Sequence, residues 1–104
     1  MEAKVFDKAS LIKQLSTHGQ EIKSFGVEKL RVFGSFAKNI DIHDESDVDL
    51  LVDFNPDKKT FDNFIELSYF LESLLGRKIE LVTPQSLSKY IGAHILKEAE
   101  GVSL

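Results

Sequence analysis

Apolar residues near the start of the chain recur at intervals of three and four, which is the spacing of one helix face. These positions are Leu11, Ile12, Leu15 and Ile22. The pattern predicts a helix over residues 8–24, with Asp7 as its N-cap and Gly26 as its stop signal. Gly19 weakens the prediction in the middle, because glycine disfavours helix interiors.

Two short apolar runs then predict neighbouring strands. The first covers residues 30–33 and ends at Gly34, and the second covers residues 48–54. The second run is apolar on both faces except for its acids, which is typical of a central strand. The polar stretch 37–46 between the runs is expected to be a loop, and the sequence Asn-Pro-Asp at 55–57 ends the second strand as a turn.

A second amphipathic helix is predicted from Thr60, which can act as its N-cap, to about Leu75, where Gly76 terminates it. Its apolar residues repeat at helical spacing, so one stripe of the helix is expected to be buried. That stripe comprises Phe61, Phe64, Ile65, Leu71, Leu74 and Leu75.

Two further elements complete the pattern. Residues 78–82 predict a third strand that Pro84 stops, and a last helix is predicted from Pro84 or Ser86 to Ala99. The apolar face of this helix comprises Leu87, Ile91, Ile95 and Leu96. The element order is therefore αββαβα. It is expected to form an α+β (mixed α/β) fold in which helices flank a short sheet.

Composition narrows the class of protein. At 104 residues the chain is expected to form a single domain over 1–104. A net charge of −4, spread along the chain, disfavours a nucleic-acid-binding surface. The chain has no cysteine, which excludes disulfides and zinc–thiolate sites. No signal-like apolar segment or membrane-spanning run is apparent, so a soluble cytoplasmic protein is expected.

Candidate chemistry is concentrated between the first two predicted strands. Gly34 and Ser35 come directly after the first strand, at a point where a helix could begin. Glycine lets the backbone approach a phosphate closely, and the serine hydroxyl and nearby N–H groups can donate to its oxygens. Lys38 is placed to assist, although a loop lysine is usually only solvated. A Gly-Ser pair alone is more often just a turn, so it gains meaning only from acids further along the chain.

Asp47 and Asp49 occur about a dozen residues later, at the start of the second strand. Residues two apart in a strand point to the same face, so these carboxylates are expected roughly 6.5–7 Å apart at Cα. Two such charges beside a buried strand are costly, and a divalent cation removes that cost. Oxygen ligands suit Mg²⁺, which completes its shell with water and substrate phosphates. The alternative is a pair of solvated acids, but residues 50–52 run directly into the core.

A third acid, Glu80, interrupts the third strand. If that strand lies beside the second, Glu80 can face Asp47 and Asp49, and can bind metal or act as a general base on an incoming hydroxyl. The alternative is an exposed acid on an amphipathic strand. Asp53 shares the face of Asp49 but lies further along, and is predicted to be a salt-bridge or surface residue.

Taken together, these residues resemble the motif of the nucleotidyltransferase superfamily related to DNA polymerase β. The shared features are a Gly-Ser pair, here Gly34-Ser35, then a gap, here of eleven residues, and then Asp47-x-Asp49 on a hydrophobic strand. The short chain resembles the minimal nucleotidyltransferase (MNT) branch. The resemblance covers nearly the whole chain, including residues 78–83 and 95–99.

The resemblance implies the nucleotidyltransferase fold and transfer of a nucleoside monophosphate, with AMP from ATP as the expected case. It implies that Asp47, Asp49 and Glu80 are catalytic and hold Mg²⁺, and that Gly34, Ser35 and Lys38 bind the nucleotide. Many MNT proteins are antitoxins of a HEPN-domain toxin, and some transfer AMP to a tyrosine of that toxin. A hetero-complex with such a partner is therefore expected.

Two departures from the family pattern bear on activity. Asn39 stands where the family often has glycine, and Glu80 stands where the third acid is commonly aspartate. Because the glutamate is longer, two alternatives to a protein-modifying nucleotidyltransferase remain open. One is a catalytically idle antitoxin that neutralises a toxin by binding alone. The other is a small-molecule nucleotidyltransferase, although such enzymes usually need a further domain to hold the substrate.

A chain this short must receive its acceptor substrate from outside. Its generous aromatic content predicts an apolar surface for a partner, either on the exposed edge of the 60–75 helix or on the last helix around Tyr90 and Ile91.

Overall fold

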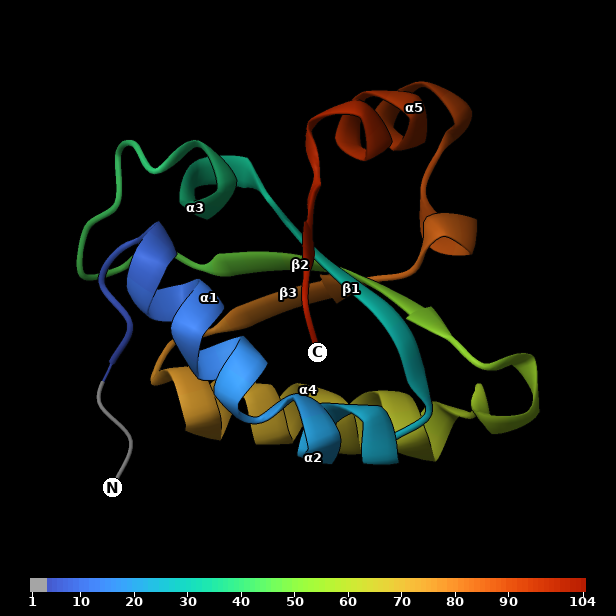
Figure 1. Ribbon diagram of the computed structural model, residues 1–104. Helices are drawn as coiled ribbons and strands as arrows, with labels where there is room; N and C mark the ends of the chain where they lie inside the picture. Colours follow the sequence, from blue (N-terminus) through green and yellow to red (C-terminus); the bar gives the residue numbers. More distant parts are fainter. Residues whose placement is uncertain (1–3) are drawn as a thin grey trace.

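The computed structural model describes residues 4–104, which fold around one four-stranded sheet of order β3-β2-β1-β4 (Figure 1). The strands are β1 (Val27–Phe33), β2 (Val48–Phe54), β3 (Ile79–Val82) and β4 (Glu100–Val102). β1 runs antiparallel to both β2 and β4, whereas β3 pairs parallel with β2. The sheet is therefore mixed, and β2 is central, as its two-sided apolar pattern predicts.

Helices lie on both sides of this sheet. In Figure 1, α2 (Gly19–Ser24) and α4 (Phe61–Leu75) lie below it, whereas α3 (Gly34–Lys38) and α5 (Lys89–Glu98) lie above. α1 (Lys8–Thr17) runs diagonally from the level of α3 towards α2. Short 3₁₀ turns at Pro56–Lys58 and Pro84–Ser86 connect β2 to α4 and β3 to α5. This arrangement confirms the expected α+β class.

The hydrophobic core lies between the sheet and α1, α2 and α4. From β2 it takes every second residue, as strand alternation requires. The residues shielded completely from solvent are Leu11, Leu15, Ile22, Val32, Val48, Leu50, Leu51, Val52, Leu67, Leu71 and Leu75. Most of these residues lie between one face of the sheet and the helices that cover it, so burial of apolar surface there is the main source of folding stability.

The prediction of one continuous helix over residues 8–24 is wrong. His18 separates α1 from α2, and its N–H group donates to carbonyls of the last turn of α1. Gly19, the first residue of α2, packs closely against Leu104. A Cβ at this position would lie 2.8 Å from the carbonyl carbon of Leu104. A helix-disfavouring residue and a tertiary contact therefore coincide at one point.

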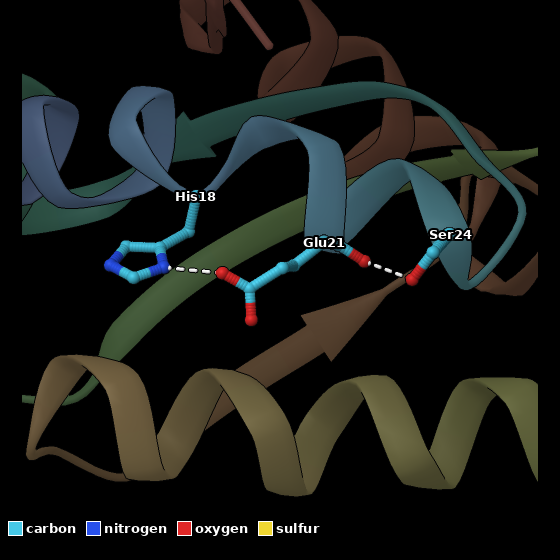
Figure 2. Close-up of polar contacts among 3 residues, drawn as sticks. All are labelled: His18, Glu21 and Ser24. Carbon is cyan, nitrogen blue, oxygen red and sulfur yellow. Dashed lines mark hydrogen bonds and ion pairs between the residues drawn. The ribbon is translucent and has the colours of Figure 1, made fainter.

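Local polar contacts stabilise both ends of this broken segment. At its start, Asp7 and Ser10 form a capping box in which each side chain accepts a hydrogen bond from the other's backbone, confirming the predicted N-cap. Across the break, His18 Nδ1 lies 2.7 Å from Glu21 Oε1, and the Ser24 hydroxyl donates to the Glu21 carbonyl (Figure 2). His18 is therefore engaged in a local contact.

The expected order αββαβα omits two short elements. The five-residue α3 begins at Gly34, where the sequence allows a helix to begin, and extends two residues into the predicted loop 37–46. The three-residue β4 comes after the last helix and pairs with β1. The burial predictions also need correction. Phe61 begins α4 and is 78% exposed, whereas Leu67 lies outside the predicted stripe and is fully buried. In α5, Ile91 and Leu96 of the predicted apolar face are exposed, and Gly92 is the residue of this helix that is buried.

Among residues 4–104, no helix combines the length and the apolar character that crossing a membrane would require.

Candidate active site

The structure brings the three predicted acids together at one end of the sheet. Asp47 immediately precedes β2, and Asp49 is its second residue. In the strand register Asp49 lies opposite Glu80 of β3 on one side and Phe33 of β1 on the other. The adjacency on which a role for Glu80 depends is therefore present.

Asp49 is the electrostatic centre of this group. Burial, a hydrogen bond with the Glu80 side chain, and the negative charges of Glu80 and Asp47 together raise the pKa of Asp49 to about 6. A hydrogen bond between two carboxyl groups requires that one of them carries a proton and donates it. Negative charge at this position is therefore penalised unless a cation or a proton compensates it.

Gly34, in the small-residue turn, packs directly against the carboxylate of Asp49. Its backbone has φ +72°, a left-handed conformation that favours glycine. A Cβ at this position would lie only 2.2 Å from Asp49 Oδ2, so no side chain can be added without moving the carboxylate. The absence of a side chain at Gly34 thus makes room for Asp49 as well as for any phosphate that approaches the turn.

Ser35 and Lys38 lie on α3, directly after Gly34. Ser35 is half-buried, and its carbonyl accepts a hydrogen bond from the Ile40 N–H. Lys38 is exposed, and its ammonium lies 3.7 Å from the carboxylate of Glu98 in α5. Lys38 is therefore near the turn, but it must leave or share this ion pair if it is to meet a phosphate.

Two surface depressions adjoin the acids. One, of about 230 Å³, is lined by Gly34, Ala37, Lys38, Glu98 and Glu100. The other, of about 520 Å³, includes Asp47 and Ser46 in its lining. Its remaining residues are Lys4, Asp44, Glu45, Gly76, Arg77 and Lys78. The acids are therefore reached from the turn and from the loop that precedes β2.

Asn39 shows how one departure from the family pattern is accommodated. It ends α3 with φ 56° and ψ 39°, a left-handed conformation that asparagine tolerates better than most residues. Its side-chain oxygen also accepts a hydrogen bond from the Lys8 N–H at 3.0 Å. Asparagine thus fulfils the conformational role for which glycine is otherwise suited.

Two other charged residues complete the description, one further along β2 and one beside the loop that precedes it. Asp53 lies 3.5 Å from Arg31 Nη2, which confirms its expected ion pair. Arg77 has no counterpart in the sequence predictions. It is 8% exposed and donates to backbone carbonyls before α1 and after α3, including that of Ser46, next to Asp47. No sequence motif singles it out, because its partners are backbone atoms far away in the chain.

The donor set fits a hard divalent cation that is completed by its substrate. Within residues 4–104, no three or more His, Cys, Asp or Glu side chains are arranged to hold a metal ion by themselves. Mg²⁺ rarely requires such a cage, because it is commonly bound by one or two carboxylates together with substrate phosphates. The raised pKa of Asp49 indicates a place where a cation would relieve repulsion between carboxylates.

Comparison with known proteins places the chain in a family. Residues 11–101 match the sequence profile described as "Nucleotidyltransferase domain". The chain is 40% identical over 85 residues to "Protein adenylyltransferase MntA" of Thermococcus cleftensis, an alignment covering 81% of this chain and 84% of that relative.

Solved structures agree with this assignment. One described as "Structure of putative minimal nucleotidyltransferase" superposes with a TM-score of 0.81 at 28% identity, covering 94% of this chain and 98% of that one. A second, "Crystal structure of the toxin-antitoxin with AMP-PNP", superposes with a TM-score of 0.65 at 20% identity, covering 83% of this chain and 70% of that one. The second likeness concerns the fold alone. The chain therefore belongs to the nucleotidyltransferase domain family and is a nucleotidyltransferase.

Proposed function

We propose that this protein transfers AMP from ATP to a hydroxyl of a partner protein, and that it acts in this way as the antitoxin of a toxin. The observation that carries the proposal is the meeting of Asp47, Asp49 and Glu80 beside the Gly34 turn. The relative named protein adenylyltransferase supports AMP as the transferred group and protein as the acceptor. The toxin–antitoxin structure with AMP-PNP supports the biological setting.

Each residue has a role that accords with its position. Asp47 and Asp49 would hold Mg²⁺ on the triphosphate, and the ion would supply neutralisation of phosphate charge. The Gly34–Ser35 turn would receive the outer phosphates through its hydroxyl and N–H groups, with Lys38 as an additional cation. Glu80, hydrogen-bonded to Asp49, would accept the proton of the incoming hydroxyl. Positioning and charge neutralisation are most of what such a transfer requires.

The acceptor in this proposal is a tyrosine of a HEPN-domain toxin. The protein exposes several large apolar side chains that such a partner can cover, as the sequence predicts for α4 and α5. The most exposed are Phe6, Ile40, Phe61, Tyr69, Tyr90, Ile91 and Leu96. Tyr90 and Ile91 lie on α5, which ends at Glu98, the residue that pairs with Lys38. A partner on α5 would therefore lie close to the nucleotide turn.

Mass spectrometry tests this proposal directly. The protein is incubated with its partner toxin, Mg²⁺ and each nucleoside triphosphate in turn, and both proteins are then weighed. A mass gain of one AMP on the toxin, found with ATP and lost when Mg²⁺ is chelated, is expected. The Asp47→Asn and Asp49→Asn variants should bind Mg²⁺–ATP weakly and show no transfer. Asp53→Asn, an acid of the same strand placed outside the site, is the matched control.

The same experiment separates the rivals. Neutralisation of the toxin with no change in its mass, retained in Asp49→Asn, would replace the proposal by an antitoxin that acts through binding alone. Transfer of AMP to a small molecule in place of the toxin would identify a small-molecule nucleotidyltransferase.

A further inference from the structure

Arg77 lies at the junction of three segments that the chain brings together from distant positions. Its Nε donates to the Val5 carbonyl at 2.6 Å, and its Nη1 donates to the carbonyls of His43 and Ser46 at 2.8 and 2.9 Å. Its Cζ lies 5.1 Å from the centre of the Phe36 ring. With 8% of its surface exposed, Arg77 is almost fully buried.

Through these contacts one guanidinium binds close to both parts of the nucleotidyltransferase motif, the Gly34–Ser35 turn and the acids that begin at Asp47. Phe36 lies two residues after Gly34 on α3 and is itself buried. Ser46 lies directly before Asp47. A planar guanidinium that packs against the Phe36 ring while binding the Ser46 carbonyl fixes the distance between the Gly34–Ser35 turn and the acid loop, which is the segment 43–47 before β2.

Apart from Arg77, the turn over residues 43–46 is held by its own hydrogen bonds and by the Lys4 ammonium, which donates to the Asp44 carbonyl at 2.6 Å. The Ser46 N–H donates to the His43 carbonyl, and the His43 N–H donates to the Ser46 hydroxyl. These two internal bonds shape the turn, and Lys4 contacts only its middle, at Asp44. Arg77 binds the two carbonyls at the ends of this turn, so it attaches the turn as a unit.

We propose that Arg77 is a positioning residue for the carboxylate site, holding Asp47 in place relative to Gly34 and Ser35. This inference rests on the proposed function, because it assigns Asp47 to the binding of the Mg²⁺–nucleotide. An arginine is required because Nε and Nη1 serve different segments at once. The single ammonium of a lysine cannot reach both, although it retains the charge.

The test compares wild type with Arg77→Lys, Phe36→Leu and Ile22→Val. Ile22 is fully buried on α2, which lies away from the acid loop in Figure 1, so Ile22→Val lowers stability without touching the contacts of Arg77. Mg²⁺–ATP affinity is measured by calorimetry at a temperature where all variants are folded. Hydrogen exchange at the amides of residues 43–48 is measured on the same samples, with the amides of β1 as reference.

Arg77→Lys should weaken Mg²⁺–ATP binding by about 10–100-fold, the range seen when groups that orient ligands are removed. Its 43–48 amides should exchange faster while those of β1 do not. Phe36→Leu should show a smaller loss in the same direction, and Ile22→Val should bind as wild type does. If Arg77→Lys does not fold, Phe36→Leu decides by the same two measurements.

Affinity within twofold of wild type, together with unchanged exchange at residues 43–48, would overturn the positioning role while leaving the proposed function intact. A wild-type protein that binds no Mg²⁺–nucleotide would instead overturn the proposed function, and the positioning role with it.

Discussion

On the face of β2 that packs against the helices of the core, Val48, Leu50 and Val52 are fully buried, whereas on the opposite face Asp49 and Asp53 alternate with Leu51. The first face contributes to stability because it removes apolar surface from water. The second contains a carboxylate whose pKa is raised to about 6, chiefly by its burial. One strand thus holds residues that stabilise the fold beside a residue whose charge destabilises it.

This difference teaches where to look for function. Residues chosen only for stability would not place a half-buried acid in contact with a second acid. A pair of adjacent acids is retained where a bound cation or substrate compensates their charge. A perturbed pKa is a recognised sign of such a functional site. Substitutions on the two faces are therefore expected to have opposite consequences.

The largest effect is expected at Glu80. Loss of a positioned general base typically lowers the rate by about 10²–10⁴-fold, so Glu80→Gln should reduce AMP transfer by that order. Mg²⁺–ATP binding should change little, because Asp47 and Asp49 remain. Glu80→Asp should retain transfer, since aspartate is the usual residue of the family at this position. Full transfer by Glu80→Gln would show that Glu80 is only a neighbour of Asp49.

On the covered face, Leu50→Ala should lower the free energy of unfolding by about 2–5 kcal/mol, because it leaves a cavity under the sheet. Urea denaturation followed by circular dichroism measures this change. Ile91→Ala, on the exposed side of α5, is the control and should change stability by no more than about 0.5 kcal/mol. Equal losses in the two variants would contradict the assigned core.

Asp49→Asn should raise the free energy of unfolding, in contrast to Leu50→Ala, and the size of this increase should depend on pH. The folded pKa of about 6 exceeds the ordinary value of 3.8, so the folded protein binds the proton more tightly than the unfolded chain does. The stability contributed by Asp49 is therefore fully present below about pH 4, falls as the pH rises to about 6, and is constant above that.

Without Mg²⁺ at pH 7, Asp49→Asn should consequently be more stable than wild type, by about 1–2 kcal/mol, because one pKa unit corresponds to about 1.4 kcal/mol and solvent screens part of the effect at this partly exposed side chain. The advantage should vanish near pH 4. Thermal unfolding at several pH values measures it. An asparagine variant that is less stable than wild type at pH 7 would show that Asp49 makes favourable contacts as an anion.

The smallest effect is expected at Asp53, an acid of the same strand. Its ion pair with Arg31 spans 3.5 Å between partly exposed side chains. Such pairs contribute about 0–1 kcal/mol, so Asp53→Asn should change the free energy of unfolding by no more than that. A larger change, measured as for Leu50→Ala, would mean that Asp53 belongs with the acidic site.

The sequence predicts much of the difference between the two faces because its signals are local. The apolar residues on both faces of 48–54 predict a central strand, which β2 is. The spacing of Asp47 and Asp49 predicts that both lie on one side of it, although Asp47 itself precedes β2. The adjacency of Glu80 is a conditional prediction, since it depends on which strands pair, and the register of β2 with β3 fulfils the condition. The catalytic and binding roles of these residues remain predictions.

Tertiary contacts determine the features that the sequence does not predict. β4 has three residues, too few for a recognisable pattern, and exists as a strand because β1 offers it an edge. Arg77 binds carbonyls 31 to 72 residues away, and a backbone carbonyl leaves no mark in a sequence. The close packing of Gly19 against Leu104 is likewise a contact between distant parts of the sequence.

Gly34 and Asp49 constrain one another over mutational time. Because every substitution of glycine adds a carbon that collides with Asp49 Oδ2, a change at position 34 either displaces this carboxylate or requires a smaller residue at position 49. Such a residue no longer carries a carboxylate. One substitution at position 34 can therefore disable the site. If a second substitution then accommodates the first, two substitutions are needed to restore the site. In a library that varies both positions and is selected for AMP transfer, aspartate at position 49 should be recovered with glycine at position 34.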